Sequence, residues 1–277
     1  MDIPSSVINL IHRALEEDIG PGDITTSLVI PGEHESKAEY LSKGNFVLAG
    51  LPFAKEVFRI LNPSIGFIIF FNDGDKVNKA DVIAEVYGNT RVILSGERLS
   101  LNILQRLSGI ATLTNMFTEK IKGLNVKIVD TRKTTPCQRF MEKYAVRTGG
   151  GYNHRFGLFD GILIKDNHIK AVGNIREAVQ RAKSSHHLIK IEVEVGNLDE
   201  LNEAIEAGAD VVMLDNMTIP DMREAVKISK SRVLLEASGS VNLENVRDIA
   251  ETGVDFISIG ALTHSAPSVD ISLKIVQ

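Results

Sequence analysis

The chain has 277 residues, of which 43% are hydrophobic and 24% are charged, and its net charge is −5 with a pI near 5.8. This composition is typical of a globular protein with an ordinary core, large enough for one big domain or two modest ones. The negative balance excludes a general nucleic-acid binder and a polybasic membrane ligand, because both need a surplus of positive surface.

Cysteine usage and hydropathy indicate where the protein works. Cys137 is the single cysteine, which excludes an intrachain disulfide and a zinc site built on paired cysteines. The first residues show neither a basic leader nor an apolar signal core, and the most apolar run, residues 65–71, is too short to span a bilayer. We therefore expect a soluble, cytoplasmic protein without a membrane partner.

The N-terminal part of the chain has an α+β pattern. An amphipathic helix is expected at about residues 5–17, because Val7, Ile11 and Leu15 recur on one face. Turn signals then separate short elements, which are strands at residues 37–41, 46–49, 66–71 and 81–87 and helices at 52–61 and 95–107. We place a boundary at residues 108–111. The prediction is an N-terminal α+β domain at 1–109, with which the segment from about 266 can pack, and a catalytic domain at 110–277.

The second half alternates between strand and helix patterns. Apolar runs lie at residues 126–130, 161–164, 189–193, 210–214, 233–235 and 256–259, and helical patterns between them at 174–185, 198–209, 219–229 and 243–252. This order predicts a parallel sheet with crossover helices. Six strands are fewer than the eight of a full (β/α)₈ barrel, so we predict an open, incomplete α/β barrel with parallel strands. A doubly wound sheet is the alternative.

Charged, polar or glycine residues stand at or just after the end of each predicted strand. In parallel α/β architectures ligands bind at the carboxyl ends of the strands, so these residues are candidates for one site. They are Arg132, Lys133, Lys165, Glu194, Asp215, Ser238, Gly239 and Gly260. The set is suited to a multiply anionic substrate.

Residues 132–170 form a basic block, with eight Lys or Arg against three acids. Such a block is usually a solvated face, but three of its cations close strands, where an unpaired charge costs several kcal/mol and needs an anionic partner. A glycine-rich bend, Gly149-Gly150-Gly151, precedes His154 and Arg155 in the block. Glycines there bring backbone N–H groups close to a ligand, although a plain flexible loop and a structural histidine are the ordinary alternatives.

The last two predicted strands end in small residues, and two middle strands end in carboxylates. Amides at Ser238-Gly239 and Gly260-Ala261 would open helices and bind phosphate, unless small residues merely permit tight turns there. Glu194 and Asp215 could bind Mg²⁺, hydrogen-bond ribose hydroxyls, or neutralise Lys133 and Lys165 in a structural network.

Read together, these segments resemble the quinolinate phosphoribosyltransferase family over most of the chain. The resemblance rests on ten segments in the family's order: Gly22-Asp23-Ile24-Thr25-Thr26, Glu97-Arg98 with Leu101-Asn102, Ser108-Gly109-Ile110-Ala111-Thr112, Asp130-Thr131-Arg132-Lys133-Thr134-Thr135-Pro136, Gly149-Gly150-Gly151 to His154-Arg155, Leu163-Ile164-Lys165-Asp166-Asn167-His168, Glu192-Val193-Glu194-Val195, Met213-Leu214-Asp215-Asn216, Glu236-Ala237-Ser238-Gly239 and Gly260-Ala261-Leu262-Thr263-His264-Ser265.

The resemblance implies an activity, its substrates and an assembly. The expected substrates are quinolinate and phosphoribosyl pyrophosphate, with Mg²⁺, giving nicotinate mononucleotide, pyrophosphate and CO₂ in NAD biosynthesis. It also implies a homodimer, or a higher oligomer, in which Arg98 enters the neighbouring subunit's site.

The resemblance and the chemistry of each side chain together suggest roles. Arg98, Arg132, His154, Arg155 and, with weaker support, Arg139 would hold the two carboxylates of quinolinate, since arginine matches carboxylates bidentately. Lys133 and Lys165 would face the phosphates and the leaving pyrophosphate, and Lys165 can also touch the substrate. Glu194 and Asp215 would bind ribose or metal, and Ser238, Gly239 and Gly260 would hold the 5′-phosphate.

The chain departs from the family's usual pattern in two segments. The family commonly has glycine after Thr-Thr-Pro and an apolar residue before the next arginine, where this chain has Cys137 and Gln138 ahead of Arg139. The family also has a second glycine after Ser-Gly, where this chain has Ser240. Neither change removes a charged group.

Three other functions fit parts of the pattern. A Schiff-base aldolase would use Lys165 as its nucleophile, provided that an apolar pocket lowers the pKa of the lysine. A nicotinate phosphoribosyltransferase would bind a substrate with one carboxylate and would release no CO₂. A non-catalytic anion sensor would have no use for the paired carboxylates Glu194 and Asp215.

Overall fold

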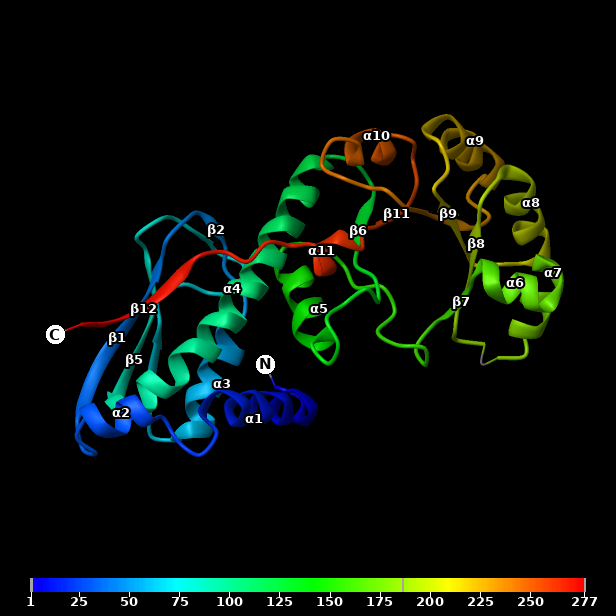
Figure 1. Ribbon diagram of the computed structural model, residues 1–277. Coiled ribbons are helices and arrows are strands. Elements are labelled where there is room, and N and C mark those ends of the chain that lie inside the picture. The colour runs from blue at the N-terminus through cyan, green and yellow to red at the C-terminus, as the bar shows by residue number, and fades with distance from the viewer. Residues whose placement is uncertain (1, 186, 277) are drawn as a thin grey trace. The chain divides into compact units, whose positions relative to one another are not determined.

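The computed structural model describes residues 2–185 and 187–276, and these form two compact units (Figure 1). Unit 1 comprises Met1–Asn115, Thr134–Gly150 and Thr263–Gln277, and unit 2 comprises Met116–Lys133 and Gly151–Leu262. The boundary predicted at residue 109 falls inside a continuous helix, α4 (Thr90–Lys120). Within the described residues, no helix combines the length and the low polarity that crossing a bilayer requires.

Unit 1 is an α+β structure around an antiparallel sheet. The sheet has the order β12-β1-β5-β3, and a separate pair is formed by β2 and β4. Its elements are α1 (Ser5–Ile19), α2 (Ile24–Val29), β1 (Glu35–Ser42), β2 (Phe46–Val47), α3 (Leu51–Leu61), β3 (Gly66–Ile69), β4 (Lys76–Val77), β5 (Val82–Asn89), most of α4, α5 (Arg139–Thr148) and β12 (Ile271–Val276). The sequence patterns did not reveal α2, α5 or β12.

The core of unit 1 lies between this sheet and the helices α3 and α4. Tyr40 of β1, Phe58 of α3 and Leu104 of α4 are fully buried in one apolar cluster. The Tyr40 hydroxyl donates to Ser100 Oγ at 2.6 Å, which satisfies the one polar atom that this ring brings into the core.

Helix α4 is much longer than the stretch 95–107 predicted from the sequence, because Ser108-Gly109 does not end it. The Ser108 hydroxyl binds the backbone of Ala49, accepting from its N–H at 3.0 Å and donating to its carbonyl at 3.2 Å. A Cβ on Gly109 would lie 2.0 Å from the Pro267 carbonyl oxygen. The two small residues therefore permit close packing within unit 1 and do not mark a break.

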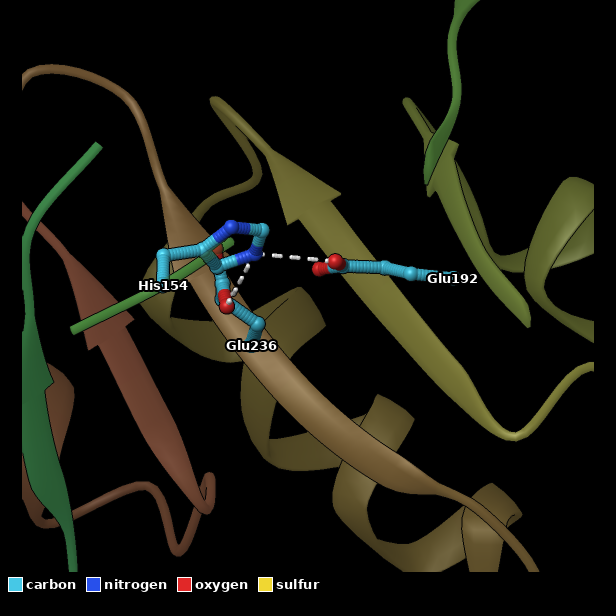
Figure 2. Close-up of side chains that lie close together, drawn as sticks. All are labelled: His154, Glu192 and Glu236. Atoms are coloured by element: carbon cyan, nitrogen blue, oxygen red, sulfur yellow. Dashed lines mark hydrogen bonds and ion pairs between the residues drawn. The ribbon is translucent and has the colours of Figure 1, made fainter. Parts of the chain in front are cut away.

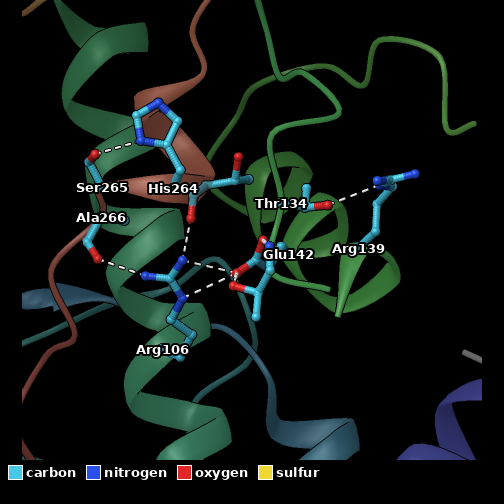
Figure 3. Close-up of polar contacts among 9 residues, drawn as sticks. Arg106, Thr134, Arg139, Glu142, His264, Ser265 and Ala266 are labelled. Atoms are coloured by element: carbon cyan, nitrogen blue, oxygen red, sulfur yellow. Dashed lines mark hydrogen bonds and ion pairs between the residues drawn. The ribbon is translucent and has the colours of Figure 1, made fainter. Parts of the chain in front are cut away.

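A buried ion pair joins α4 and α5 in unit 1 (Figure 3). Glu142 is fully buried, and its carboxylate accepts from Arg106 Nη2 at 2.9 Å and from the Thr135 N–H at 3.0 Å. Arg106 also donates to the carbonyl oxygens of Thr263 and Ala266. One arginine and one glutamate thus hold α4, α5 and the segment after the last parallel strand together.

Unit 2 is an open parallel sheet covered by helices. The strand order is β6-β11-β10-β9-β8-β7, and all the pairs are parallel. The strands are β6 (Lys127–Val129), β7 (Ile162–Ile164), β8 (Ile191–Val195), β9 (Val211–Asp215), β10 (Leu234–Ser238) and β11 (Phe256–Ser258). No pairing joins β6 to β7 within the described residues, so the predicted open α/β barrel is confirmed.

The helices of unit 2 follow its strands in the predicted alternation. They are α6 (Asp166–Val172), α7 (Ile175–Ala182), α8 (Leu198–Ala207), α9 (Ile219–Ser229), α10 (Val246–Ala250) and α11 (Ala261–His264), which ends in unit 1. Of these, α7, α8, α9 and α10 lie along one side of the sheet (Figure 1). Asn174, Asn197 and Thr218 cap α7, α8 and α9 by accepting from backbone N–H groups three residues later. Such caps start the helices directly after the loops at the sheet edge.

Removing the charge of Glu142 should destabilise the protein strongly. We expect Glu142→Gln to lower the free energy of unfolding by about 3 kcal/mol, because it leaves the partly buried guanidinium of Arg106 without its counter-charge. Urea unfolding followed by circular dichroism measures this loss. The control is Glu224→Gln in the exposed pair with Lys227, where we expect a change of less than about 1 kcal/mol; equal effects would contradict a special role for the buried pair.

Candidate active site

One cavity of about 340 Å³ lies at the carboxyl ends of the parallel strands in unit 2. Its lining brings together residues that are far apart in the sequence, and eight of them are among the predicted site residues: Arg132, Lys133, His154, Arg155, Lys165, Glu194, Asp215 and Ser238. Parallel strands expose their carboxyl ends on one edge of the sheet, which explains this convergence.

The strand register places the acidic side chains of the cavity at defined depths. Glu194 on β8 and Glu236 on β10 both lie opposite Met213 of β9, so the three residues form one row across the sheet. Asp215 lies opposite Ser238 one row nearer the strand ends in register. Glu192 faces the same side as Glu194, because residues two apart on a strand point the same way, and it lies deeper along β8.

Basic side chains line the same cavity. Lys165 directly follows β7 and its Nζ lies 2.8 Å from Glu194 Oε2. Burial, and then the positive charge of Arg132, lower the pKa of Arg155 below its ordinary value. Two guanidinium groups that repel each other in a partly buried cavity are pre-organised to bind an anion with several negative charges.

His154 lies between two buried carboxylates (Figure 2). Its Nε2 is 2.9 Å from Glu192 Oε2 and 3.6 Å from Glu236 Oε2. Burial, and then the negative charge of Glu192, raise the pKa of Glu236 to about 7, while the charges of His154 and Lys165 oppose this rise. The carboxyl group of Glu236 is therefore present in both its protonated and its charged form near neutral pH.

Glu192, Glu236, Asp130 and Ser258 are lining or neighbouring residues to which the sequence patterns assigned no role. Asp130 is fully buried and its Oδ1 accepts from the His154 N–H at 2.9 Å, which ties the loop that carries His154 to the end of β6. Glu192 and Glu236 interrupt apolar strands, and an acid inside such a strand needs a partner. An acid within an apolar run is visible in the sequence and indicates a buried polar contact. The sequence does not show which residue the acid contacts.

Two groups of residues in unit 2 have the chemistry to hold a metal ion. Glu194 and Asp215 offer carboxylate oxygens from adjacent strands, and both also line a second, neighbouring hollow. The ligand atoms of His154, Glu192 and Glu236 all lie within 4.8 Å of one another. Cations lie close to both groups, because Lys165 is paired with Glu194 and because Arg132 and Arg155 line the cavity with His154 and Glu236.

The segment after β10 makes a tight turn that requires glycine at one position. Gly239 has a φ of +92°, and a Cβ there would lie 2.3 Å from Asn216 Oδ1. Ser240 and Cys137, which stand where the family that the chain resembles commonly has glycine, have φ values of +53° and +64°. Both departures therefore fall where a glycine adopts the backbone conformation without the roughly 1–2 kcal/mol that other residues lose.

The glycine-rich bend has a structural role where its packing is visible. A Cβ on Gly149 would lie 2.3 Å from the Ala111 carbonyl oxygen, so this glycine permits α5 to end against α4 in unit 1. This packing role of Gly149 differs from both interpretations of the bend, a backbone site for a ligand and a plain flexible loop.

Four predicted site residues are not among those that line the cavity. Gly239 and Gly260 follow β10 and β11 without contributing to the lining, and Arg98 and Arg139 belong to unit 1. Arg139 Nε donates to Thr134 Oγ1 at 2.9 Å (Figure 3). The exposed side chain of Arg98 makes no hydrogen bond or ion pair with any other part of the described chain.

Family models and known proteins that match this chain all point to one family. The model "Quinolinate phosphoribosyl transferase, C-terminal domain" matches residues 110–274, and the model "Quinolinate phosphoribosyl transferase, N-terminal domain" matches residues 23–108. A probable nicotinate-nucleotide pyrophosphorylase (carboxylating) of Bacillus subtilis is 47% identical over 96% of this chain and 92% of its own length.

A plant relative and a solved structure point to the same family. A quinolinate phosphoribosyltransferase (decarboxylating) of Nicotiana glauca is 42% identical over 96% of this chain and 81% of its own length. The structure of the nicotinate-nucleotide pyrophosphorylase from Francisella tularensis superposes with a TM-score of 0.95 at 44% identity, covering 99% of this chain and 98% of that one.

The raised pKa of Glu236 predicts a stability change with pH. The folded protein holds this proton up to about pH 7 and the unfolded chain only up to about 4.5, so stability is fully present below pH 4.5 and is lost as pH rises through 7. The expected loss is roughly 3 kcal/mol. Urea unfolding of wild type and Glu236→Gln between pH 4.5 and 8 measures it.

The difference between the two proteins isolates Glu236, because His154 and the other titrating groups are present in both. The free energy of unfolding of Glu236→Gln should fall less over this pH range than that of the wild type. Parallel pH curves would contradict the assignment.

Proposed function

Because this chain belongs to the quinolinate phosphoribosyl transferase family, we propose a role for each cavity residue in the reaction that it catalyses. The chain transfers the phosphoribosyl group of phosphoribosyl pyrophosphate to the ring nitrogen of quinolinate with loss of CO₂. The products are nicotinate mononucleotide, pyrophosphate and CO₂, and the step belongs to NAD biosynthesis. The observation that carries the residue roles is the meeting of four cations and four carboxylates in one cavity.

Arg132, His154 and Arg155 bind the two adjacent carboxylates of quinolinate. All three line the cavity, and the repulsion that lowers the pKa of Arg155 is relieved when a dianion lies between the guanidinium groups. Charged hydrogen bonds of this kind contribute about 1.5–3 kcal/mol each. Arg139 is a weaker candidate for the same role.

Lys133 and Lys165 bind the phosphate groups of the second substrate. A compact ammonium charge stabilises the negative charge that grows on the departing pyrophosphate. Ser238, together with the backbone at Gly239 and Gly260, holds the 5′-phosphate, since Ser238 lines the cavity at the end of β10.

Glu194 and Asp215 bind the ribose hydroxyls or Mg²⁺. Magnesium commonly uses one or two carboxylates plus substrate phosphates, and these two lie at adjacent strand ends open to the cavity. When bound, the ion would neutralise part of the pyrophosphate charge. Glu194 is already paired with Lys165, so the carboxylate also holds this lysine in place for the phosphates.

The proposed chemistry needs no protein nucleophile. The pyridine nitrogen displaces pyrophosphate at the anomeric carbon through an oxocarbenium-like state, and the bond to the neighbouring carboxyl group then breaks to release CO₂. The positive ring nitrogen stabilises the electron pair left on the ring carbon, which takes up a proton. The protein contributes by positioning the substrates and by stabilising charge.

The structure disfavours the aldolase alternative. An aldolase lysine needs an apolar pocket, whereas Lys165 is exposed and paired with Glu194 at 2.8 Å. The anion-sensor alternative leaves the carboxylates of Glu194 and Asp215 without a purpose in the cavity.

The active assembly is a homodimer or a higher oligomer, and Arg98 completes the site of a neighbouring subunit. The support is that the exposed Arg98 has no polar partner elsewhere in residues 2–185 and 187–276. The protein acts in the cytoplasm, in keeping with a chain whose single cysteine forms no disulfide.

A turnover assay tests the function directly. Quinolinate labelled in the carboxyl group next to the ring nitrogen, mixed with phosphoribosyl pyrophosphate and Mg²⁺, should release labelled CO₂ and nicotinate mononucleotide in equal amounts. Chelation of Mg²⁺ should lower the rate at least about tenfold, because the pyrophosphate charge is then unscreened. Product from nicotinate without CO₂ release would overturn the quinolinate assignment.

Lys133→Ala should lose at least about 100-fold in kcat while the fold is kept, because it removes one charge that stabilises the leaving group. Steady-state kinetics and a thermal unfolding curve measure the two effects. The control is Lys127→Ala on β6, a residue outside the cavity lining. Near-normal turnover of Lys133→Ala would contradict the proposed role of this lysine.

Mixing two inactive variants tests the shared site. Equal amounts of Arg98→Ala and Lys133→Ala subunits, allowed to exchange, should recover about a quarter of wild-type turnover, because half of the dimers gain one intact site of two. Each variant alone should stay inactive. Failure to recover activity, with exchange verified by native mass spectrometry, would exclude a site completed by Arg98 of a second subunit.

A further inference from the structure

His154 and Glu236, which line the cavity, form one polar cluster with Glu192, which lies outside the lining. Glu192 of β8 and Glu236 of β10 leave 7% and 2% of their surfaces exposed, and both carboxylates face the same nitrogen of His154. The strand between them, β9, presents Met213 to the cavity. The imidazole ring is therefore the polar group that bridges two acids across an apolar side chain.

The two acids allow the ring few other orientations. Rotating His154 away would leave two buried carboxylates facing each other with no positive group between them. An unpaired buried charge is strongly unfavourable, and burial and then the negative charge of Glu192 raise the pKa of Glu236 even with the histidine in place. Glu192 Oε1 is also buried without a hydrogen-bond partner among the described residues, so Oε2 and its contact with His154 carry the polar interactions of this side chain.

The backbone on the other side of His154 is held as firmly. Its N–H donates to the buried Asp130 at 2.9 Å, so main chain and ring are each tied to an acid on a strand or at a strand end. Figure 2 shows that the second ring nitrogen, Nδ1, lies on the edge of the ring away from both carboxylates. A ring fixed at one nitrogen presents the other in a constant direction.

We propose that Glu192 and Glu236 are positioning residues that orient His154 for the substrate, so that the ring, with a proton on both nitrogens, donates from Nε2 to the acids and from Nδ1 to a carboxylate of quinolinate. The inference rests on the proposed binding role of His154 and adds two residues that do not touch the substrate themselves. Glu192 has the larger part, because its contact with Nε2 is 2.9 Å against 3.6 Å for Glu236.

A double-mutant cycle tests whether the acids act through the histidine. We expect Glu192→Gln to raise the KM for quinolinate about tenfold, the equivalent of one weakened charged hydrogen bond, and to change the KM for phosphoribosyl pyrophosphate less than about twofold. Glu236→Gln should raise the KM for quinolinate about threefold. In a His154→Ala background, both substitutions should have almost no further effect.

Other outcomes would overturn the inference. If the effects of Glu192→Gln and His154→Ala multiply, the acid acts independently of the ring. If the KM values of both substrates rise together, the acid has only a structural role. Should Glu192→Gln fail to fold, Glu192→Asp keeps the charge on a shorter side chain, and its raised KM for quinolinate must likewise vanish in the His154→Ala background.

The matched control is Glu85→Gln in unit 1. Glu85 is also 7% exposed and ion-paired, with Lys37, but belongs to β5, so its loss should leave both KM values unchanged. The activity of the wild-type protein distinguishes a failure of the proposed function from a failure of this inference alone. A wild type that releases no CO₂ from quinolinate overturns the function and the inference together, whereas an active wild type with a multiplicative cycle overturns the inference alone.

Discussion

The parallel register of β8, β9 and β10 is the constraint on which the site depends. It sets Glu194, Met213 and Glu236 in one row and Asp215 beside Ser238 in the next. Because every strand of the open barrel runs the same way, the loops that carry Arg132, Lys133 and Lys165 all leave from the same edge. A one-residue slip of any strand would turn its acid away from the cavity.

The charges of the cavity are arranged in layers, and this arrangement fits a reaction between two anions. Glu192 and Glu236 are buried against the partly buried His154, while Lys133 and Lys165 are exposed. The buried acids hold the binding groups in place, and cations that face solvent remain available to the substrates. A cavity of cations alone would repel itself, and the lowered pKa of Arg155 shows this repulsion in part.

Local sequence patterns predict much of the fold. The elements that they miss depend on contacts with residues far away in the chain. All six parallel strands lie within two residues of the predicted runs except at the end of β10, and α9 has the predicted bounds. The length of α4 was underestimated because Ser108-Gly109 is typical of a helix break. The glycine is needed for another reason, since a side chain there would clash with the carbonyl oxygen of the distant Pro267. Likewise β12 is a strand because it pairs with β1, a partner more than two hundred residues away.

The candidate site was predictable in its residue types but not in its internal contacts. Strand-end position singled out six of the residues that line the cavity, namely Arg132, Lys133, Lys165, Glu194, Asp215 and Ser238. It could not single out Glu192 and Glu236, since an acid inside an apolar strand signals only that some partner exists. Positions where the family prefers glycine, Cys137 and Ser240, proved to have left-handed backbone, which a pattern of residue types indicates only indirectly.

The sequence by itself determined the alternation of strands and helices, the charge at each strand end and the family to which the chain belongs. Those properties depend on residues close together in the chain or on the order of short segments. Only the tertiary structure decided which acid faces which base, that His154 lies between Glu192 and Glu236, and that Arg106 finds its partner in Glu142. Such pairings depend on register and burial, and these arise when segments separated by tens of residues pack against one another.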